Sequence, residues 1–496
     1  MAERMSPEQQ RDQQARRLYS AAAVRELDAR ATGGRIEVGY ALMQKAAASA
    51  WSVLSQCQPG AAAIDIVCGP GNNGGDGYEL AVLAHRAGRE VRVWSLGEPP
   101  MGREAALACA AWSAQGPVRP YLPGCLDGAS LVVDAVYGIG LSRAPESDAA
   151  TAIEEIRHCG AWVMAIDIPS GLNADTGQAL GAVICADLTH SFVGRKLGLY
   201  TGQGPALAGE RRFDALDVAP TEEIPALAEL LDAADLARYL PRRSRSAHKG
   251  SHGHVLIVGG DEGMAGAVLL ATRAALRAGA GLLSVATRER HASLLAASQP
   301  EGMFRGIESA AAFSELASRA RVLAIGPGLG QTAWSQTLWS AALSIDRPMV
   351  VDADALNLLA AHPLRRDNWV LTPHPGEAAR LLGLSTAEVE ADRVAAVRAL
   401  VARYGGVAIL KGAGSLIAGA GLAVCPYGNP GMATGGSGDA LTGVLAALIA
   451  QGLDLETAAR MAVLAHARAG DLAALKGERG LLPSDLIEAL RSVVNP

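Results

Sequence analysis

The sequence predicts an α/β protein with two domains, and three observations support this fold class. The chain has 496 residues, more than a single hydrophobic core usually organises. It contains 57 glycines but only 4% aromatic residues, which is typical of tight turns between strands and helices and unlike a β-sandwich. In both halves, short apolar segments alternate with helical segments, so we expect α/β domains built on parallel sheets.

The first half begins with a helical pattern at Ser20 and then alternates between strands and helices. Residues 63–68 predict a buried strand, and residues 69–77 predict a glycine-rich loop. Residues 78–87 predict a helix that ends at Gly88, because glycine favours the position after a helix. Further strands are predicted at residues 91–94, 131–134 and 162–167. This order favours a Rossmann-like three-layer sandwich.

A domain boundary is predicted between residues 219 and 246. Prolines at positions 220, 225 and 241 interrupt the alternating pattern there, and a basic stretch follows. We therefore expect one domain over residues 1–218, a linker over 219–246 and a second domain over 247–496. Strands of the second domain are predicted at residues 255–258, 322–325, 349–352 and 407–410.

Charge and cysteine content exclude several classes of protein. The net charge is −6, and no basic run is longer than two residues, so we expect no nucleic-acid partner. Seven scattered cysteines without a Cys-x-x-Cys pair indicate reduced thiols and a cytoplasmic protein. Residues 1–17 predict a frayed tail that lacks the apolar core of a signal peptide. No apolar run is long enough to cross a membrane, so we expect no membrane partner.

The glycine-rich loop of the first half contains polar side chains suited to a ligand. Residues 69–74 match Gly-x-Gly-x-x-Gly between a strand and a helix, a pattern that alone is weak evidence of dinucleotide binding. Asn72, Asn73 and Asp76 place carbonyl and carboxylate oxygens among exposed backbone amides. This mixture suits a cation beside a phosphate or hydroxyl group. The alternative is a structural turn with glycines in left-handed conformations.

Two aspartates end predicted parallel strands, where ligands bind in open α/β sheets. Asp134 precedes the flexible segment 137–144, and Asp167 opens the sequence Asp-Ile-Pro-Ser-Gly. Each aspartate could instead cap a helix or form a buried ion pair. Because three loops converge on this edge of the sheet, we favour a ligand site.

In the second half, the glycine-rich segment 429–439 leads directly into a helix. Five apolar residues from position 441 to 449 form one face of this helix, and Gly452 ends it. A glycine turn at a helix N-terminus offers free amides and the helix dipole to a phosphate. Asp439 lies beside that turn and can accept a proton from a hydroxyl that attacks a phosphoryl group. The alternative is that Asp439 only caps the helix.

Two further loops of the second half are candidates for ligand contacts. Residues 411–415, Lys-Gly-Ala-Gly-Ser, follow a predicted strand and fit a contact to a nucleotide, although an ordinary hairpin turn is the alternative. His374 stands between two prolines, so its loop is stiff and favours a ligand contact over a solvent-facing histidine.

The motifs of the first half resemble those of the NAD(P)H-hydrate epimerase domain. The matching segments are residues 18–28, 71–77, 134–145, 165–172 and 196–202. The resemblance implies that Asp167 contacts the substrate and transfers a proton, and that Asn73, Asp134 and Ser170 help to bind K⁺. It also implies that the hydrated dinucleotide contacts Asn72, Asn73, Gly74, Gly75, Asp76, Gly138, Ile139, Gly140, Leu141, Ser142, Arg143, Ala144 and Asp167.

The turn Gly436–Asp439 resembles that of the ribokinase-like superfamily, and residues 247–490 as a whole resemble the ADP- or ATP-dependent NAD(P)H-hydrate dehydratase domain. The matching segments are residues 248–250, 263–267, 326–330, 372–377, 411–415 and 429–439. The resemblance implies Mg²⁺ with ADP or ATP, and catalysis by Asp439. It places the hydrated dinucleotide against Ala265, Gly328, His374 and Asp439. It places the adenine nucleotide against Lys411, Gly412, Ala413, Gly414, Ser415 and Gly438.

Together, the two resemblances imply a bifunctional enzyme that repairs hydrated NADH and NADPH, and we expect it to form a homo-oligomer. One half would interconvert the R and S hydrates, and the other would dehydrate the S hydrate through phosphoryl transfer and elimination. Two other classes remain open from the residues alone. A small-molecule kinase would release a stable phosphorylated product, and a non-catalytic nucleotide sensor would show no turnover.

Overall fold

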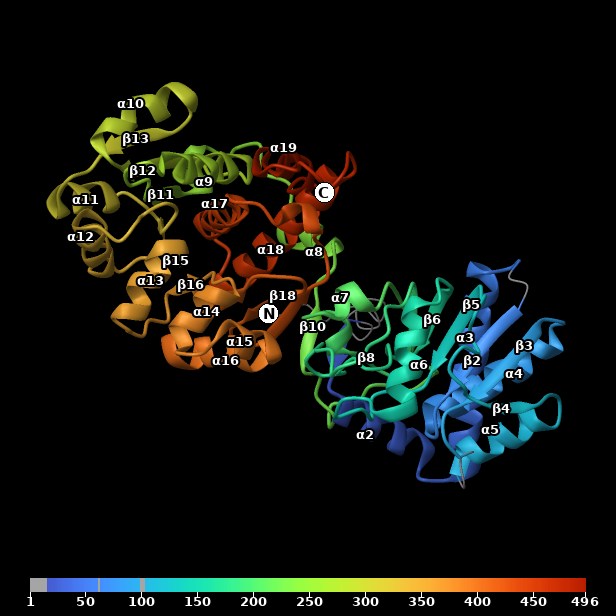
Figure 1. Ribbon diagram of the computed structural model, residues 1–496. Coiled ribbons are helices and arrows are strands. Elements are labelled where there is room, and N and C mark those ends of the chain that lie inside the picture. The colour runs from blue at the N-terminus through green and yellow to red at the C-terminus, as the bar shows by residue number, and fades with distance from the viewer. Residues whose placement is uncertain (1–15, 61–62, 99–102) are drawn as a thin grey trace. The chain divides into compact units, whose positions relative to one another are not determined.

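The computed structural model describes residues 16–60, 63–98 and 103–496. It divides into two compact units at Glu229 and Leu230 (Figure 1). This division falls within the stretch predicted as a linker, and that stretch also contains strand β10 (Ala228–Leu230) and helix α8 (Ala234–Tyr239). The predicted frayed tail lies mostly outside the described residues, but its last residue belongs to strand β1 (Arg17–Tyr19).

The first unit is built on a seven-stranded sheet in the order β4-β3-β2-β5-β6-β7-β9. Every neighbouring pair is parallel. Strand order reverses between β2 and β5, which is where a doubly wound sheet forms its ligand crevice. The strands are β2 (Ala63–Cys68), β3 (Glu90–Ser95), β4 (Val118–Pro120), β5 (Leu131–Ala135), β6 (Trp162–Ile166), β7 (Leu188–Phe192) and β9 (Glu210–Asp214).

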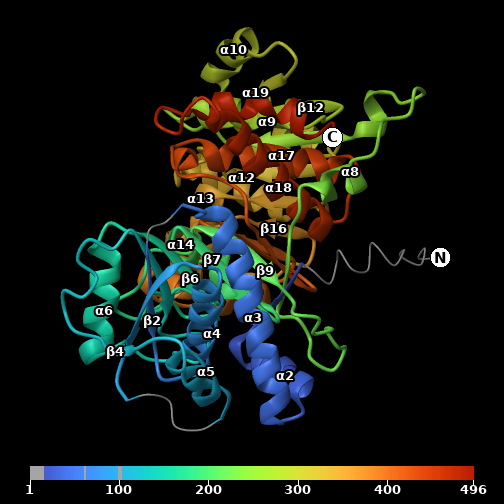
Figure 2. The same cartoon turned by 90° about the vertical axis from the view of Figure 1, so that its right-hand side faces the viewer.

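Helices cover both faces of this sheet and so form the predicted three layers. Helices α3, α4 and α5 share one apolar core with the sheet, and α6 forms the core on the opposite face. Figure 2 shows the long helix α3 beside α4. The helices of the unit are α2 (Ala21–Thr32), α3 (Ile36–Cys57), α4 (Asn72–Arg86), α5 (Arg103–Ser113), α6 (Ser147–His158) and α7 (Gly204–Leu207), and the short strand β8 (Arg195–Lys196) pairs with β1.

The second unit contains the sheet order β13-β12-β11-β14-β15-β16-β17-β18-β19. Strands from β13 to β17 pair in parallel, and β18 and β19 are antiparallel. The strands are β11 (His254–Val258), β12 (Leu282–Thr287), β13 (Met303–Gly306), β14 (Val322–Ile325), β15 (Met349–Val351), β16 (Trp369–Leu371), β17 (Val407–Leu410), β18 (Ser415–Ala418) and β19 (Leu422–Cys425).

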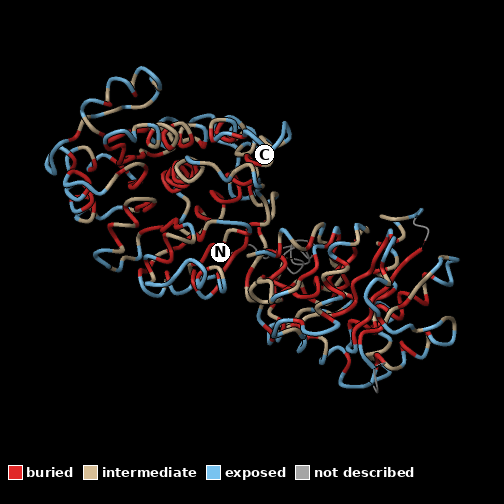
Figure 3. The backbone as a smooth tube through the Cα atoms, viewed as in Figure 1, coloured by how far each residue is buried: buried red, intermediate tan, exposed pale blue. Residues whose placement is uncertain are grey.

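Helices α9, α17, α18 and α19 pack on one face of this sheet in a single apolar core. Residues that point to the other face, such as Leu256 and Leu323, are also buried, so both faces of the sheet are covered. Figure 3 shows the buried residues of this unit in red. The helices are α9 (Ala265–Arg277), α10 (Glu289–Ser298), α11 (Ala310–Ala317), α12 (Ala333–Leu343), α13 (Ala353–Ala361), α14 (Pro375–Leu382), α15 (Thr386–Ala391), α16 (Arg393–Tyr404), α17 (Ser437–Ala450), α18 (Leu455–Ala474) and α19 (Pro483–Val493). No helix in the described ranges is both long and apolar enough to span a membrane.

One predicted boundary in the first unit is wrong. Residues 72–77 do not belong to a loop, because helix α4 begins at Asn72 with Gly71 as its N-cap. The glycines are needed for close packing: a Cβ atom on Gly74 would lie 1.9 Å from the Gly69 carbonyl oxygen, and one on Gly77 would lie 2.6 Å from Ala135 Cβ. The helix therefore starts at the sheet edge and presents its first turn there.

Replacing Gly74 by alanine should destabilise the first unit by about 1–3 kcal/mol, because the new methyl group overlaps a backbone oxygen. Urea denaturation of the variant and the parent chain measures this loss. Gly60→Ala is the matched control, since no atom of the described residues, apart from its chain neighbours, lies within 4 Å of its Cβ position. An equal change in both variants would contradict the packing argument.

Candidate functional sites

Asp134 is a buried carboxylate at the end of β5. It accepts hydrogen bonds from the Ser170 backbone amide (2.8 Å) and hydroxyl (2.6 Å), and from the Val136 amide (3.2 Å). Burial raises the pKa of Asp134 to about 6, because these neutral donors only partly offset the loss of water. Among the described residues it neither caps a helix nor forms an ion pair.

Asp167 directly follows β6 and forms an ion pair with the buried Lys196. The Lys196 ammonium also donates to the Ser191 hydroxyl (3.1 Å) and the Phe192 carbonyl (2.7 Å). Asp167 has a φ of +68°, a strained conformation for a residue with a side chain. The buried ion pair weighed from the sequence therefore exists, and it fixes the Asp167 carboxylate at the sheet edge.

Several predicted residues converge on one cavity of about 950 Å³ in the first unit. A Cβ atom on Gly138 would lie 3.4 Å from both Asn73 Oδ1 and Asp167 Oδ2. The amide nitrogen of Asn73 is buried without a hydrogen-bond partner. The predicted residues that line the cavity are Asn72, Asn73, Asp76, Gly138, Ile139, Gly140, Leu141, Ser142, Arg143, Ala144 and Asp167.

Other predicted residues of this site lie behind the cavity wall. Gly74 and Gly75 pack against the Gly69 carbonyl and the Met43 side chain. Asp134 and Ser170 are fully buried and bonded to each other.

Several charged residues of this cavity were not predicted from the sequence, and Lys196 and Asp28 are two of them. Burial raises the pKa of Asp28, and the carboxylates of Glu104 and Asp167 raise it further. Burial also raises the pKa of Asp76, with Asp167 as the next cause. Lys196 and Asp28 both fall in segments that resemble the epimerase domain. A single lysine such as Lys196, in the short strand β8, has no recognisable sequence pattern, and only the fold places it beside Asp167.

In the second unit, helix α17 begins after Gly436, which has a φ of +96°. Asp439 is the third residue of the helix, and no side chain caps the helix, so the capping alternative is wrong. Burial raises the pKa of Asp439 to about 7, and the carboxylate of Asp352 adds to the rise, whereas the Lys411 ammonium opposes it. Such a group is suited to accept a proton near neutral pH.

Asp352, just after β15, is the centre of the polar contacts around Asp439. It accepts hydrogen bonds from Lys411 Nζ (2.9 Å), Thr372 (2.8 Å) and Thr442 (2.8 Å). Burial alone would raise the pKa of Asp352, but Lys411 and the hydroxyl donors outweigh it and hold the pKa below its usual value. A Cβ atom on Gly438 would lie 3.3 Å from Lys411 Nζ, so this ammonium faces the first turn of α17.

Residues 411–415 connect the antiparallel strands β17 and β18, so the predicted hairpin turn exists. The Ser415 hydroxyl donates to the Gly412 carbonyl (3.0 Å) and closes the turn. The buried Arg393 donates to the Leu410 and Lys411 carbonyls (3.3 and 3.1 Å). The hydrogen bonds of Arg393 and Ser415 thus fix the turn, and the Lys411 ammonium points to α17.

His374 caps helix α14, and its side chain is still 52% exposed to solvent. Its Nδ1 accepts from the Gly376 amide (3.0 Å), and its backbone amide donates to Glu377 Oε2 (2.8 Å). Partial burial lowers the pKa of His374 more than the nearby Glu377 carboxylate raises it. Glu377 Oε2 also lies 3.7 Å from Lys411 Nζ, which connects this loop to the charges around Asp352.

Gly328 lies on a loop beside the start of α9, where Ala265 is the first residue. A Cβ atom on Gly328 would lie 2.7 Å from the Met264 carbonyl oxygen, next to Ala265 at the start of α9. A Cβ atom on Gly326 would lie 1.8 Å from the Asp352 carbonyl oxygen. The structure thus brings the predicted residues of the second unit around one end of its sheet. Sequence reasoning missed Asp352, Thr442 and Glu377, although the aspartate at the end of a predicted strand was a usable signal.

Fold and sites together define a protein with two α/β units, the second of which has a ribokinase-like fold with a glycine turn at the start of α17. Residues 39–198 match the family model described as YjeF-related protein N-terminus, and residues 255–492 match the model described as NAD(P)H-hydrate dehydratase. The chain belongs to the family of bifunctional NAD(P)H-hydrate repair enzymes.

The similarity to relatives extends over nearly the whole chain. The bifunctional NAD(P)H-hydrate repair enzyme Nnr of Coxiella burnetii is 44% identical over 97% of this chain and 99% of its own length. The Escherichia coli enzyme of the same name is 43% identical over 92% of this chain and 90% of its own length.

Solved structures resemble about half of the chain. A hypothetic protein from Streptococcus mutans has a TM-score of 0.51 and 29% identity, covering 53% of this chain and 98% of its own. A ribokinase-like superfamily protein from Enterococcus faecalis has a TM-score of 0.50 and 32% identity, covering 53% of this chain and 94% of its own. The ribokinase-like fold predicted for the second half is confirmed.

The raised pKa of Asp439 predicts a pH-dependent cost to stability. The folded state binds a proton more tightly than the unfolded state, so stability falls as pH rises from about 4 to about 7. Asp439→Asn should therefore stabilise the chain by about 1–2 kcal/mol at pH 8, a value discounted for partial exposure to solvent. The gain should be small at pH 4.5. Urea denaturation at both pH values measures it, and an equal gain at both would contradict the shifted pKa.

Proposed function

We propose that the two activities of this bifunctional enzyme are divided between its halves. Residues 1–218 would form the NAD(P)H-hydrate epimerase domain, residues 219–246 a linker, and residues 247–496 the NAD(P)H-hydrate dehydratase domain. The observation that supports the second assignment most directly is Asp439, which lies on the first turn of α17 beside Lys411 and Asp352. This arrangement offers a base and a phosphate site at one place.

In the dehydratase site, we assign the two ligands to separate loops. The adenine nucleotide contacts Lys411, Gly412, Ala413, Gly414, Ser415 and Gly438. The S hydrate of NADH or NADPH contacts Ala265, Gly328, His374 and Asp439. Lys411 faces the first turn of α17, where free amides and the helix dipole attract a phosphate.

Magnesium would enter this site as a complex with ADP or ATP. The described residues contain no group of three His, Cys, Asp or Glu side chains that could hold a metal ion. Asp352 already accepts hydrogen bonds from Lys411, Thr372 and Thr442. Mg²⁺ is commonly held through nucleotide phosphates and few protein groups, so the residues present fit a nucleotide-borne ion.

The chemistry follows from the position of Asp439. Its carboxylate takes the proton of the C6 hydroxyl as that oxygen attacks the terminal phosphoryl group and a phosphoanhydride bond breaks. The C6–O bond of the phosphate ester then breaks, and inorganic phosphate leaves with its electron pair. The neighbouring carbon loses a proton to solvent, which restores the ring double bond. Phosphate is a far better leaving group than hydroxide, so the nucleotide makes elimination possible.

In the epimerase site, we assign proton transfer to Asp167. It faces Gly138 and Asn73 in the cavity of the first unit, and Lys196 holds its carboxylate in place. The hydrate would contact the predicted cavity residues of the first turn of α4 and of segment 138–144. Lys196 acts here as a positioning residue for Asp167.

We further propose that Asn73, Asp134 and Ser170 bind K⁺. Asp134 has three neutral donors and no cationic partner among the described residues. The Asn73 side-chain oxygen, Oδ1, lies at the cavity beside Gly138. The Tyr137 carbonyl lies 3.2 Å from the Ser170 hydroxyl. An all-oxygen set with one carboxylate fits a hard monovalent cation.

The cellular setting and assembly are also proposals. All seven cysteines are free thiols, which supports a reducing compartment such as the cytoplasm. We keep the homo-oligomer as a prediction that analytical ultracentrifugation tests directly. A strictly monomeric chain would contradict it.

The test of the function is recovery of NADH absorbance from a mixture of both hydrates with Mg²⁺ and ADP or ATP. The parent chain should restore all of the hydrate, and Asp439→Asn should lose at least about 10²-fold in rate because it lacks the base. Asp167→Ala should restore only the S share quickly and then slow to the spontaneous epimerisation rate. Lys196→Met should behave like Asp167→Ala. A stable phosphorylated product without recovery of NADH would contradict the dehydratase assignment.

The potassium site predicts a specific ion dependence of the first activity. Ser170→Ala should raise the K⁺ concentration for half-maximal epimerisation by roughly tenfold or more, with choline chloride keeping ionic strength constant. Dehydration of pure S hydrate by the same variant is the control. We assign this activity to the second unit, where Lys411 pairs with the buried carboxylate of Asp352 and Ser170 takes no part. An unchanged K⁺ dependence of epimerisation would contradict the site.

A further inference from the structure

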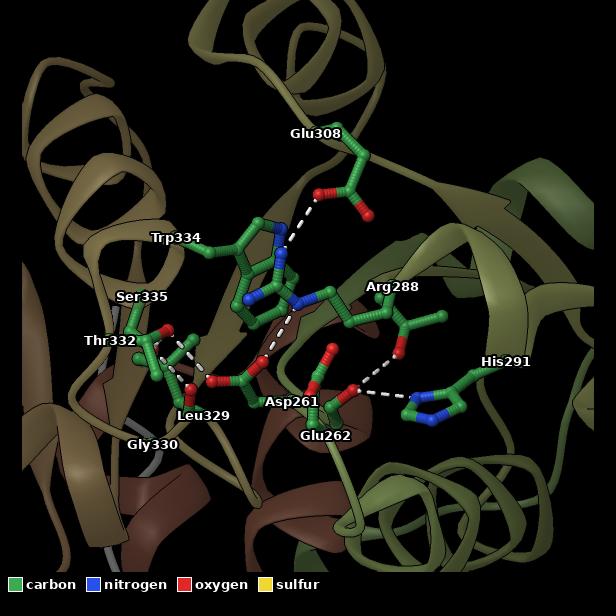
Figure 4. A network of polar contacts seen from close by, with 12 residues as sticks. Asp261, Glu262, Arg288, His291, Glu308, Leu329, Gly330, Thr332, Trp334 and Ser335 are labelled. Atoms are coloured by element: carbon green, nitrogen blue, oxygen red, sulfur yellow. Dashed lines mark hydrogen bonds and ion pairs between the residues drawn. The ribbon is translucent and has the colours of Figure 1, made fainter.

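Asp261 connects three loops at the carboxyl edge of the second sheet. It is buried and follows β11, and its amide donates to the Gly328 carbonyl (2.7 Å). One carboxylate oxygen accepts from Arg288 Nε (2.7 Å), and the other accepts from the Thr332 hydroxyl (2.8 Å) (Figure 4). Its carbonyl also accepts from the Met264 amide (2.9 Å), so both loops assigned to the hydrate are bonded to this one residue.

Arg288 holds Asp261 and is itself held on three sides. Besides Asp261, its guanidinium donates to Glu308 Oε2 (2.9 Å) and lies 4.5 Å from the centre of the Trp334 ring. Trp334 in turn donates to the Ile307 carbonyl (2.7 Å). Figure 4 shows the guanidinium between Asp261, Glu308 and Trp334. The planar fork of arginine suits this combination of two carboxylates and an aromatic ring, which a lysine cannot reproduce.

The loop that Asp261 contacts, residues 326–330, is rich in glycine and is ordered by several hydrogen bonds. The Leu329 amide donates to the Gly326 carbonyl (3.0 Å), and the Gly330 amide donates to Asp354 (2.8 Å). Gly328 and Gly330 have φ values of +54° and +70°, and glycine loses more conformational freedom on ordering than other residues. A Cβ atom on Gly330 would lie 2.9 Å from Asp261 Oδ2, so the carboxylate lies directly against the loop. The nucleotide loop 411–415 is supported separately, by Arg393 and by its own Ser415.

We propose that Arg288 is a positioning residue for the hydrated dinucleotide, acting through Asp261 on the loops that contain Gly328 and Ala265. The inference rests on the proposed assignment of the hydrate to these two loops. It separates the supports of the two ligands: Arg288 orders the hydrate side, and Arg393 orders the nucleotide side. Loss of Arg288 then weakens the binding of one substrate and leaves that of the other unchanged.

The experiment measures the KM for the S hydrate and the KM for the nucleotide in the same chain. Arg288→Met should raise the hydrate KM by roughly ten- to hundredfold through displacement of the loop, while the nucleotide KM stays within about twofold. Arg288→Lys, which keeps the charge but not the fork, should give an intermediate rise. A general loss of folding would lower the melting temperature and the apparent kcat, because less enzyme is active, without a selective rise in the hydrate KM. Arg288→Lys remains informative if Arg288→Met does not fold.

Arg290→Met is the matched control. Arg290 lies two positions along the chain, is 56% exposed, and contacts the exposed Glu262 at 3.3 Å, so its loss should leave both KM values unchanged. Gly328→Ala tests the underlying assignment, because its Cβ atom would meet the Met264 carbonyl oxygen. If Gly328→Ala raises the hydrate KM and Arg288→Met does not, the role of Arg288 is wrong. If neither variant raises it, the assignment of the hydrate to these loops is wrong.

Discussion

Both units depend on a buried carboxylate at the end of a parallel strand. A carboxylate that is removed from water loses its hydration, and hydrogen-bond donors or a cation must compensate for this loss. The two units compensate for it differently. Asp134 has three neutral donors, and burial leaves its pKa raised to about 6. Asp352 has two hydroxyl donors and the Lys411 ammonium, and its pKa falls below the usual value. No cationic side chain of the described residues pairs with Asp134, whereas Lys411 pairs with Asp352.

The contrast between Asp352 and Asp439 explains how one small region can provide both a fixed charge and a base. Lys411 and two hydroxyl donors keep Asp352 ionised. Burial raises the pKa of Asp439 to about 7, and the Asp352 carboxylate adds to the rise, whereas Lys411 opposes it. Two carboxyl groups with different environments thus take different protonation states at the same pH. Thr442 lies one turn after Asp439 on α17 and donates to Asp352, so the helix that contains Asp439 is bonded to the carboxylate that helps to raise its pKa.

Much of the fold and part of the sites followed from the sequence, because strand ends and glycine turns have local patterns. The strands before Asp134, Asp167 and Asp352 and the helix after Gly436 have such patterns. The start of α4 did not follow, since Gly74 and Gly77 looked like loop residues and are instead sites of close packing. Lys196 was also missed, because its role depends on β6 and β7, which bring Asp167 and Phe192 to it from distant parts of the chain.

The second unit orders its two glycine-rich loops with two separate arginines. Arg393 is buried and donates to the Leu410 and Lys411 carbonyls at the start of the turn 411–415. Arg288 donates to the carboxylate of Asp261, which contacts residues 326–330. Glycine lets a backbone approach a ligand closely, but it also leaves the loop flexible. A guanidinium with several fixed donors restores the order without placing a side chain in the ligand's path. Because the two supports share no residue, each ligand can be positioned independently, and both loops adjoin the same Asp352, beside the base on α17.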